Sequence, residues 1–201
     1  DLVDLVKKGL KPSDIITRKS FENAMMIHAA IGGSTNALLH IPAIAHEFGI
    51  EIELDEFDEI HRKIPFIANI KTSGKYPTHY FWYAGGLPAV MKELKDYLHI
   101  DQLTITGKTL GENLAELESY SYLEYMSSEA PANLPDDVIF PAAEPINDEG
   151  SLAVLKGNLA PMGAVVKHSA VEPEMHKFKG KIKIDFIFKR KWFSLHCCKQ
   201  R

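Results

Sequence analysis

The sequence predicts an α/β protein, because segments of helical periodicity alternate with short apolar runs typical of strands. The chain has 201 residues, which is enough for one medium domain or parts of two. Apolar residues make up 45% and charged residues 25%, so the chain can bury a core as ordinary globular proteins do. The formal net charge of -4 gives no indication of a nucleic-acid partner. No apolar run reaches the roughly 20 residues that cross a bilayer, so no membrane association is expected.

The first clear helix is predicted over residues 17–31. Thr17 or Ser20 can cap its start. Residues on one face recur at helical spacing, namely Phe21, Ala24, Met25, His28 and Ile31. Gly32 and Gly33 follow directly and are expected to end the helix.

A second helix is predicted to begin at Ser34 or Thr35 and to run to Phe48. It is apolar nearly all round, so it should be buried, and His40 on it is interpreted as a core histidine rather than a catalyst. Pro42 predicts a kink, because proline removes one hydrogen bond of the helix.

The next elements continue the alternation as far as residue 117. In order, they are a short helix over 55–62, a strand-like run over 66–70, an irregular aromatic loop over 71–83, a helix from the Ala84-Gly85-Gly86 turn to Leu98, a strand over 103–106, and a helix through about residue 117.

The composition changes after Ser127. Prolines and acidic residues are frequent over 128–150, which indicates a linker. Residues 151–171 are rich in valine, leucine and alanine and are interrupted by glycine, which predicts strands with tight turns. The predicted organisation is therefore an α/β part over 1–127, a linker over 128–150, and a β-rich part over 151–201.

Two glycine-containing helix starts are the candidate binding sites. In the first, Gly33 is followed by the small polar residues Ser34, Thr35 and Asn36, and free N–H groups at a helix start favour a carboxylate or phosphate. Gly85 and Gly86 provide the same arrangement before the later helix. The alternative for each is an ordinary turn with a normal helix cap.

The remaining polar residues do not form a recognisable catalytic or metal-binding constellation. Gly107-Lys108-Thr109 lacks the glycine that a phosphate-binding loop needs five positions earlier, where Gln102 stands, so nucleotide hydrolysis is rejected. His40 and His46 are six residues apart and do not share a helix face, which argues against a metal pair. No residue is therefore assigned a catalytic or a metal-binding role.

Cysteine usage indicates a reducing compartment. Only Cys197 and Cys198 are present, and adjacent cysteines rarely bond to each other because the bridge is strained. Without a disulfide framework, a cytoplasmic location is expected.

Taken together, several blocks resemble the dihydroxy-acid and sugar-acid dehydratases, the family that includes dihydroxy-acid dehydratase and phosphogluconate dehydratase. The blocks lie in the family's order between about residues 15 and 180. They are Ser20-Phe-Glu-Asn-Ala24, Gly32-Gly-Ser-Thr-Asn-Ala37 with His40 and Ala43-Ile-Ala45, Ala84-Gly-Gly-Leu-Pro-Ala-Val-Met91, Thr104-Ile-Thr-Gly-Lys-Thr-Leu-Gly-Glu-Asn-Leu114 and Gly157-Asn-Leu-Ala-Pro-Met-Gly-Ala-Val-Val-Lys167. The Leu39–His46 segment looks closer to the sugar-acid (xylonate-like) branch.

The resemblance implies the C-terminal part of an N-terminal α/β domain, followed by the start of a β-rich, barrel-like domain. It implies loss of water from a 2,3-dihydroxy carboxylic acid or sugar acid to give a 2-keto acid. It also implies an iron–sulfur cluster and Mg²⁺ as cofactors and a homodimeric or homotetrameric assembly. The metal would act as a Lewis acid toward the leaving hydroxide, and the substrate carboxylate must be held in place.

The sequence departs from the family's pattern at the residues that carry the chemistry. The family's cluster cysteines and the carboxylates and lysine of its metal site belong to motifs upstream of the Gly32–Asn36 block, and its catalytic serine belongs to a downstream motif. None of these motifs is present here, and two neighbouring cysteines cannot wrap a cluster. From about Phe186 the tail becomes basic and aromatic, unlike the family's continuation. The chain is therefore expected to be a fragment of such a hydro-lyase. The alternative is a non-catalytic remnant of a disrupted gene, acting at most as a binding or assembly module.

Overall fold

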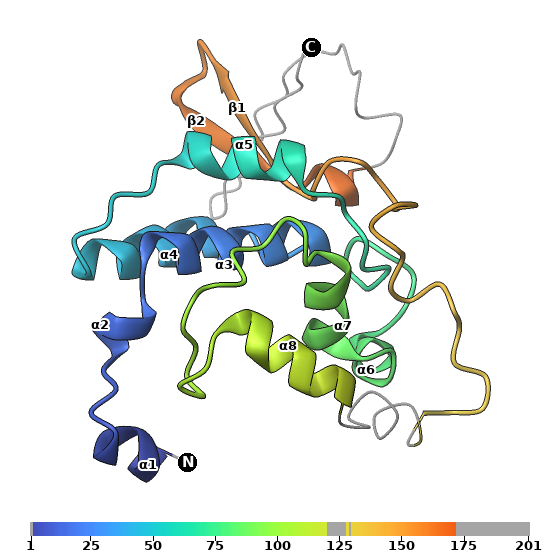
Figure 1. Cartoon of the computed structure of the whole chain (residues 1–201). Coiled ribbons are helices and arrows are strands. Elements are labelled where there is room, and N and C mark those ends of the chain that lie inside the picture. The colour runs from blue at the N-terminus through green and yellow to red at the C-terminus, as the bar shows by residue number, and fades with distance from the viewer. Residues whose placement is uncertain (1, 120–127, 129, 172–201) are drawn as a thin grey trace, which may run out of the picture.

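The computed structural model describes residues 2–119, 128 and 130–171 of the chain (Figure 1). The helices are α1 (Leu2–Lys7), α2 (Pro12–Ile15), α3 (Arg18–Ile31), α4 (Ala37–Glu47), α5 (Leu54–Lys63), α6 (Thr78–Tyr83), α7 (Gly86–Glu93) and α8 (Leu110–Ser119), with a short 3₁₀ turn η1 (His168–Ala170). The strands are β1 (Ala153–Gly157) and β2 (Ala160–Val166). Helices and a small sheet are thus combined in one chain, as expected for an α/β sequence.

Helix α3 lies at the centre, with α5 packed on one side and α7 on the other (Figure 1). Its predicted bounds are confirmed. The Thr17 side chain accepts a bond from the Ser20 amide, and the Ser20 side chain accepts one from the Thr17 amide. At the other end Gly32 adopts the left-handed conformation that favours glycine (φ 67°).

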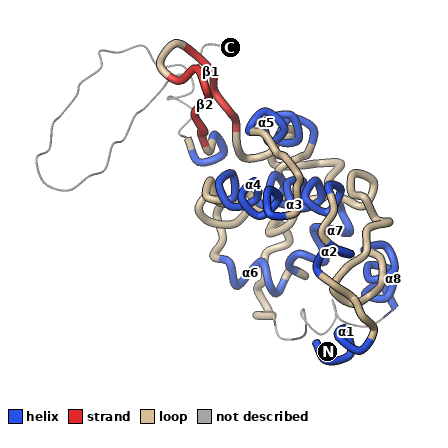
Figure 2. The backbone as a smooth tube through the Cα atoms, turned by 90° about the vertical axis from the view of Figure 1, so that its left-hand side faces the viewer, coloured by secondary structure: helices blue, strands red, loops and turns tan. Residues whose placement is uncertain are grey.

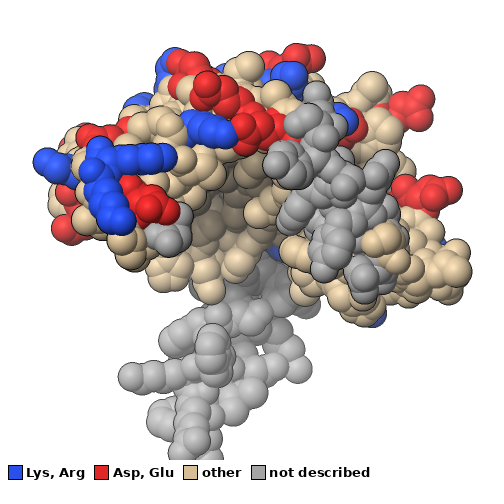
Figure 3. Space-filling model, turned by 60° about the horizontal axis from the view of Figure 1, so that its bottom comes forward, with Lys and Arg blue, Asp and Glu red and all other residues tan. Residues whose placement is uncertain are grey.

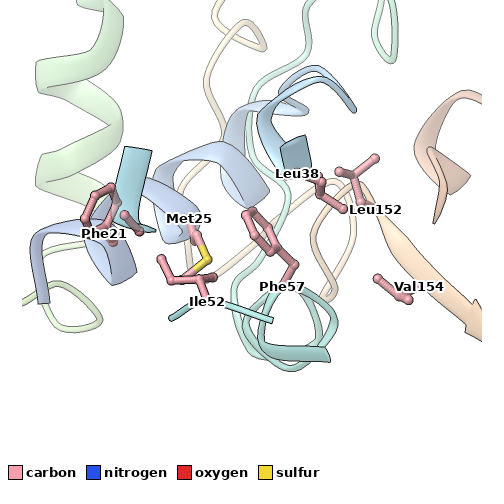
Figure 4. Close-up of a cluster of buried hydrophobic side chains, with 8 residues drawn as sticks. Phe21, Met25, Leu38, Ile52, Phe57, Leu152 and Val154 are labelled. Atoms are coloured by element: carbon pink, nitrogen blue, oxygen red, sulfur yellow. The ribbon is translucent and has the colours of Figure 1, made fainter. Parts of the chain in front are cut away.

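Two groups of buried apolar side chains surround α3. The first joins α3 to α4, α5 and the hairpin, and its members include Phe21, Met25, Leu38, Ile52, Phe57, Leu152 and Val154 (Figure 4). The second joins the C-terminal half of α3 to α7 and to the segment after α5, and its members include Ile27, Ala29, Ala30, Ile64, Ile67, Val90 and Leu94. Burial of this apolar surface fixes the position of α3, and with it the turn that follows α3.

The two strands form an antiparallel hairpin that projects beside α5 (Figure 2). Ala153 pairs with Val166 and Val154 with Val165, and the register becomes irregular between Leu155 and Gly157. The prediction of strands over 151–171 is confirmed. Val154 is buried.

The predictions of strands over 66–70 and 103–106 are wrong. Residues 66–70 are extended but make only isolated bridges, among them Phe66 with Asn147 and Ala68 with Ile139. Residues 103–106 contribute a single bridge, between Leu103 and Thr109, at the base of a turn. In both places the backbone groups bond to passing loops rather than to a strand, so no sheet forms there among the described residues.

Residues 138–147 run beside 66–69 and exchange backbone hydrogen bonds with them. Asn69 donates to the Val138 carbonyl and Phe140 donates to the Ile67 carbonyl. Val138 is fully buried. The division into 1–127, 128–150 and 151–201 stays a prediction, but this part of the proposed linker packs against the helical part.

Three helix predictions need correction. Helix α4 is not buried, because only Leu38 and Ala45 are covered, Leu39 is 72% exposed, and His40 lies on the surface rather than in the core. The predicted loop over 71–83 contains helix α6, and α7 ends at Glu93 instead of Leu98. The apolar composition of α4 indicated a buried helix. Burial depends on what packs against a helix, and only one side of α4 is covered by other elements.

Acidic and basic side chains are interspersed on the face shown in Figure 3. In the part of the chain that the structure describes, no helix is long and apolar enough to span a membrane.

Candidate functional site

The turn between α3 and α4, residues 33–36, is the feature around which the site is built, and we call it the Gly33 turn. Ser34, Thr35 and Asn36 are exposed. Asn36 already has helical backbone angles (φ -61°, ψ -26°), and the Ala37 amide donates to the Ser34 carbonyl at 3.0 Å. Helical bonding therefore begins at Ser34, close to the predicted start.

This geometry leaves backbone donors at the surface. The Asn36 amide approaches the Ser34 Oγ at 3.3 Å. The amides of Ser34 and Thr35 donate to no acceptor within the described residues. Unbonded N–H groups at the first turn of a helix, together with the helix dipole, attract an anion.

His28 supports the Gly33 turn from below. Its Nε2 lies 2.8 Å from the Ser34 carbonyl oxygen. A Cβ atom at Gly33 would lie 2.1 Å from the His28 Cδ2, so only glycine lets the turn lie against the imidazole. Burial lowers the pKa of His28, and the positive charge of Lys167 acts in the same direction, while the bond to Ser34 opposes them.

His61 of α5 contacts the His28 ring nitrogen that does not face Ser34. Its Nε2 lies 3.3 Å from the His28 Nδ1, and its Nδ1 accepts a hydrogen bond from the Leu152 amide at 3.1 Å. The two rings meet edge to face, with centroids 5.4 Å apart. The side chain is 1% exposed, and burial, with smaller effects from His28 and His168, lowers the pKa of His61 to about 3.

Lys167, which directly follows β2, bonds to the residue just before the Gly33 turn. Its Nζ donates to the Gly32 carbonyl at 2.6 Å and to the Thr72 Oγ1 at 3.3 Å. Next to it, the Ser169 hydroxyl donates to the Ser73 Oγ at 2.9 Å. Partial burial lowers the pKa of Lys167. The turn is thus supported by α3, α5, the loop at 72–73 and the segment after β2.

Replacing Lys167 by methionine is expected to lower the free energy of unfolding by about 1 kcal/mol, because the aliphatic stem still packs while the bonds to Gly32 and Thr72 are lost. Chemical denaturation measures this change. The exposed Lys156, paired with Asp55 on the same hairpin, supplies the control: Lys156→Met should cost less, since exposed ion pairs contribute little. Equal costs would mean that Lys167 does not anchor the turn.

The second predicted helix start lies at the beginning of α7. Gly85 and Gly86 are buried and have positive φ values of 101° and 59°. No hydrogen bond within the described residues joins them to the Gly33 turn. They form the connection between α6 and α7, and their part in substrate binding stays a prediction.

Gly107-Lys108-Thr109 serves as a helix start. The Thr109 amide donates to the Glu112 Oε2 at 2.7 Å, and the Glu112 amide donates to the Thr109 Oγ1 at 3.2 Å, which is a reciprocal cap at the start of α8. Lys108 pairs with Glu116. These side chains are engaged within the protein rather than arranged around a phosphate.

Comparison with known proteins identifies the family. The model of the dihydroxy-acid/6-phosphogluconate dehydratase N-terminal domain matches residues 1–113, and the model of the C-terminal domain of the same family matches residues 137–191. The chain belongs to this dehydratase family. The Gly33 turn lies within the N-terminal match and Lys167 within the C-terminal match, so the contacts around the turn join segments from both family domains. The tail after residue 171 lies outside the described residues, and its interpretation stays a prediction.

Curated relatives include enzymes named for both substrate classes. The chain is 46% identical over 183 residues to a dihydroxy-acid dehydratase of Methanosarcina barkeri, a match that covers 91% of this chain and 31% of the relative. It is 47% identical over 181 residues to a dihydroxy-acid dehydratase of Ignicoccus hospitalis, covering 89% and 30%. It is 43% identical over 182 residues to an L-arabinonate dehydratase of Rhizobium leguminosarum, covering 90% and 29%. The chain spans about a third of the length of these dehydratases.

The described residues do not fit the cofactors that the dehydratase family implies. They contain no cysteine, and they hold no group of three or more histidine, cysteine, aspartate or glutamate side chains that could bind a metal ion. Thiolates bind iron–sulfur clusters, so these residues supply none of the usual cluster ligands.

Sequence reasoning missed the residues that hold the Gly33 turn. The helical spacing predicts His28 on the apolar face of its helix, but it gives no indication of the contact with His61. The available signal was a histidine at a core position on each of two neighbouring helices, since a buried histidine needs hydrogen-bond partners. Lys167 closes one of the family-like blocks, yet nothing in its spacing indicated a bond to Gly32.

Proposed function

We propose that this chain is the part of a dehydratase that receives the carboxylate of a 2,3-dihydroxy carboxylic acid or sugar acid, which the enzyme converts to a 2-keto acid by loss of water. The observation that carries the proposal is the Gly33 turn, where Ser34, Thr35 and Asn36 are exposed and two backbone amides are without a protein acceptor among the described residues. A carboxylate is the part of such a substrate that these donors suit.

The names of the relatives support this class of reaction. Relatives that match over 89–91% of the chain include dihydroxy-acid dehydratases and an L-arabinonate dehydratase. Both names describe acids that carry a carboxylate next to hydroxyl groups. A rigid turn that holds the carboxylate would fix the distance from the acid group to the carbons that lose water, which is how binding promotes a reaction at a neighbouring atom.

The proposal includes several features of the whole enzyme. These are a barrel-like C-terminal domain that begins with the β1–β2 hairpin, an iron–sulfur cluster and Mg²⁺ bound by residues other than those described, a homodimer or homotetramer, and a cytoplasmic location. Gly85 and Gly86 are proposed only as a secondary contact, because both are buried.

Titration of the ¹⁵N-labelled chain with L-arabinonate, and separately with a 2,3-dihydroxy carboxylic acid, tests the proposal. We expect the amide signals of Ser34, Thr35 and Asn36 to shift on binding. Thr35→Pro removes one donor amide at the first position of the helical turn, where proline is tolerated, and should weaken binding about tenfold. Thr35→Val retains the amide and serves as the matched control.

Two outcomes would contradict the proposal. If neither acid shifts these signals, the turn does not bind a carboxylate in this chain, and the chain would then act at most as a non-catalytic binding or assembly module. If Thr35→Pro and Thr35→Val weaken binding equally, the backbone amide is not the recognising group. Assay of 2-keto acid formation, together with iron and acid-labile sulfide determination, tests whether the chain itself carries out the reaction.

A further inference from the structure

Three hydrogen bonds in series connect the segment before β1 to the Gly33 turn. The Leu152 amide bonds to the Nδ1 of His61, the Nε2 of His61 faces the Nδ1 of His28, and the Nε2 of His28 bonds to the Ser34 carbonyl, with distances of 3.1, 3.3 and 2.8 Å. His61 is 1% and His28 is 8% exposed. The series therefore passes through the interior, from Leu152 in the segment that matches the family's C-terminal domain to the Gly33 turn.

The two ends of the series determine where the protons lie. A backbone amide can only donate, so the Nδ1 of His61 carries no proton, and a carbonyl oxygen can only accept, so the Nε2 of His28 carries one. With both rings neutral, the remaining proton of His61 is on Nε2 and points at the bare Nδ1 of His28. Both histidines are then Nε2–H tautomers, and all four ring nitrogens are engaged.

Glycines allow the backbone to reach both ends of the series. Gly33 lies against the His28 ring, as described above. On the other side, a Cβ at Gly150 would lie 2.8 Å from the Ala29 Cβ and 2.9 Å from the His61 Nδ1, and the Gly150 amide donates to the His61 carbonyl at 2.6 Å. The backbone at both ends is thus fitted to the two rings, which is typical of a specific arrangement rather than of loosely packed core histidines.

We propose that His28 and His61 are positioning residues for the Gly33 turn, two neutral Nε2–H imidazoles that couple the Leu152 backbone to the Ser34 carbonyl. The role of the turn as a carboxylate site rests on the proposed function, whereas the coupling itself can be measured without a substrate. Through it, the segment that leads into the hairpin determines where the turn's exposed amides lie.

The tautomers are the first test. A long-range ¹H–¹⁵N correlation spectrum of the 201-residue chain at pH 7 distinguishes Nδ1–H, Nε2–H and doubly protonated imidazoles. We expect His28 and His61 both to give the Nε2–H pattern. An Nδ1–H or a doubly protonated ring at either position would overturn the proposal, and this measurement needs no variant.

Amide exchange tests the positioning role. The Ala37 amide bonds to the same Ser34 carbonyl that accepts from His28, so its exchange reports on the turn. His28→Leu retains an apolar side chain without a donor and should accelerate exchange at Ala37 about tenfold. His28→Gln, whose amide can still donate to Ser34, should stay near the wild-type rate, and the exposed His46→Leu on α4 should leave it unchanged.

The outcomes separate this inference from the proposed function. Equal acceleration in His28→Leu and His28→Gln would show that His28 acts only by packing, which would overturn the positioning role. If the wild-type chain binds no hydroxy acid, the proposed function fails, while the tautomers and the exchange rates still decide the role of the two histidines. If both hold, His28→Leu should weaken L-arabinonate binding and His28→Gln should restore it.

Discussion

Replacing Gly33 by alanine is expected to lower the free energy of unfolding by about 3 kcal/mol. The new Cβ would lie 2.1 Å from the His28 Cδ2 and 2.5 Å from its Nε2, far inside van der Waals contact. Either the turn or the ring must move, and movement of the ring breaks its bonds to Ser34 and His61. Urea denaturation followed by circular dichroism gives the change directly.

Two controls show whether the effect comes from the contact with His28. Gly157 has no atom within 4 Å of the position of a Cβ, so Gly157→Ala should change stability by less than about 1 kcal/mol. In a His28→Ala background the ring is gone, and the cost of Gly33→Ala should largely disappear, since neighbouring sites are not additive. A full cost in that background would mean that the backbone of the turn, not the ring, excludes the alanine.

Acidification from pH 6.5 toward pH 3 is expected to lower the free energy of unfolding, by roughly 1 kcal/mol per pH unit, through protonation of His61 in the unfolded chain. In the unfolded chain His61 titrates near its ordinary value of 6.5, whereas burial lowers its pKa in the folded protein to about 3. Between these values the unfolded state binds the additional proton, so stability is complete above pH 6.5 and is lost as the pH falls. The lowered pKa of His28 adds a loss in the same direction.

The groups that face the pair determine the size of this effect. His28 and His168 disfavour a proton on His61, whereas Asp58 on α5 favours one. Lys167 disfavours a proton on His28. Measured unfolding free energies at half-unit steps from pH 7 to pH 4.5 give the slope. The His61→Gln variant should lose the His61 contribution to this slope. The His46→Gln variant, changed at an exposed position, should keep the wild-type slope. A wild-type stability that stays level from pH 6.5 to pH 5 would contradict the buried neutral pair.

The elements that sequence analysis predicted well are those whose signals are local. Thr17, Ser20 and Gly32 mark the ends of α3 through bonds within a few residues of one another, and the alternation in residues 151–171 is enough for a hairpin. The strands expected at 66–70 and 103–106 depended on a partner strand that no local pattern reveals, and the partners are loops. Helix α4 was expected to be buried from its composition, but its surroundings decide this, and one side remains open.

The candidate site divides in the same way. Gly33, Ser34, Thr35 and Asn36 were candidates from glycine and cap chemistry, and the structure places the three polar residues at the surface, while their binding role stays a prediction. The support beneath them could not be predicted, because it joins residues distant in the sequence. His28 meets His61 across 33 positions, His61 meets Leu152 across 91, and Lys167 meets Gly32 across 135. Such pairs become apparent only when the helices have been packed.

These long separations have a consequence for synthesis on the ribosome. Helix α3 and the first helical bonds of α4 can form early, because they are local contacts. The bonds from Leu152 to His61 and from Lys167 to Gly32 require residues made 91 and 135 positions later. At synthesis rates of about 5–20 residues per second, Leu152 and Lys167 are made roughly 5–30 seconds after His61 and Gly32, their respective partners. The nascent chain would therefore complete the contacts around the Gly33 turn only near the end of the segment described here, and a chain stalled before Leu152 would have α3 without these contacts.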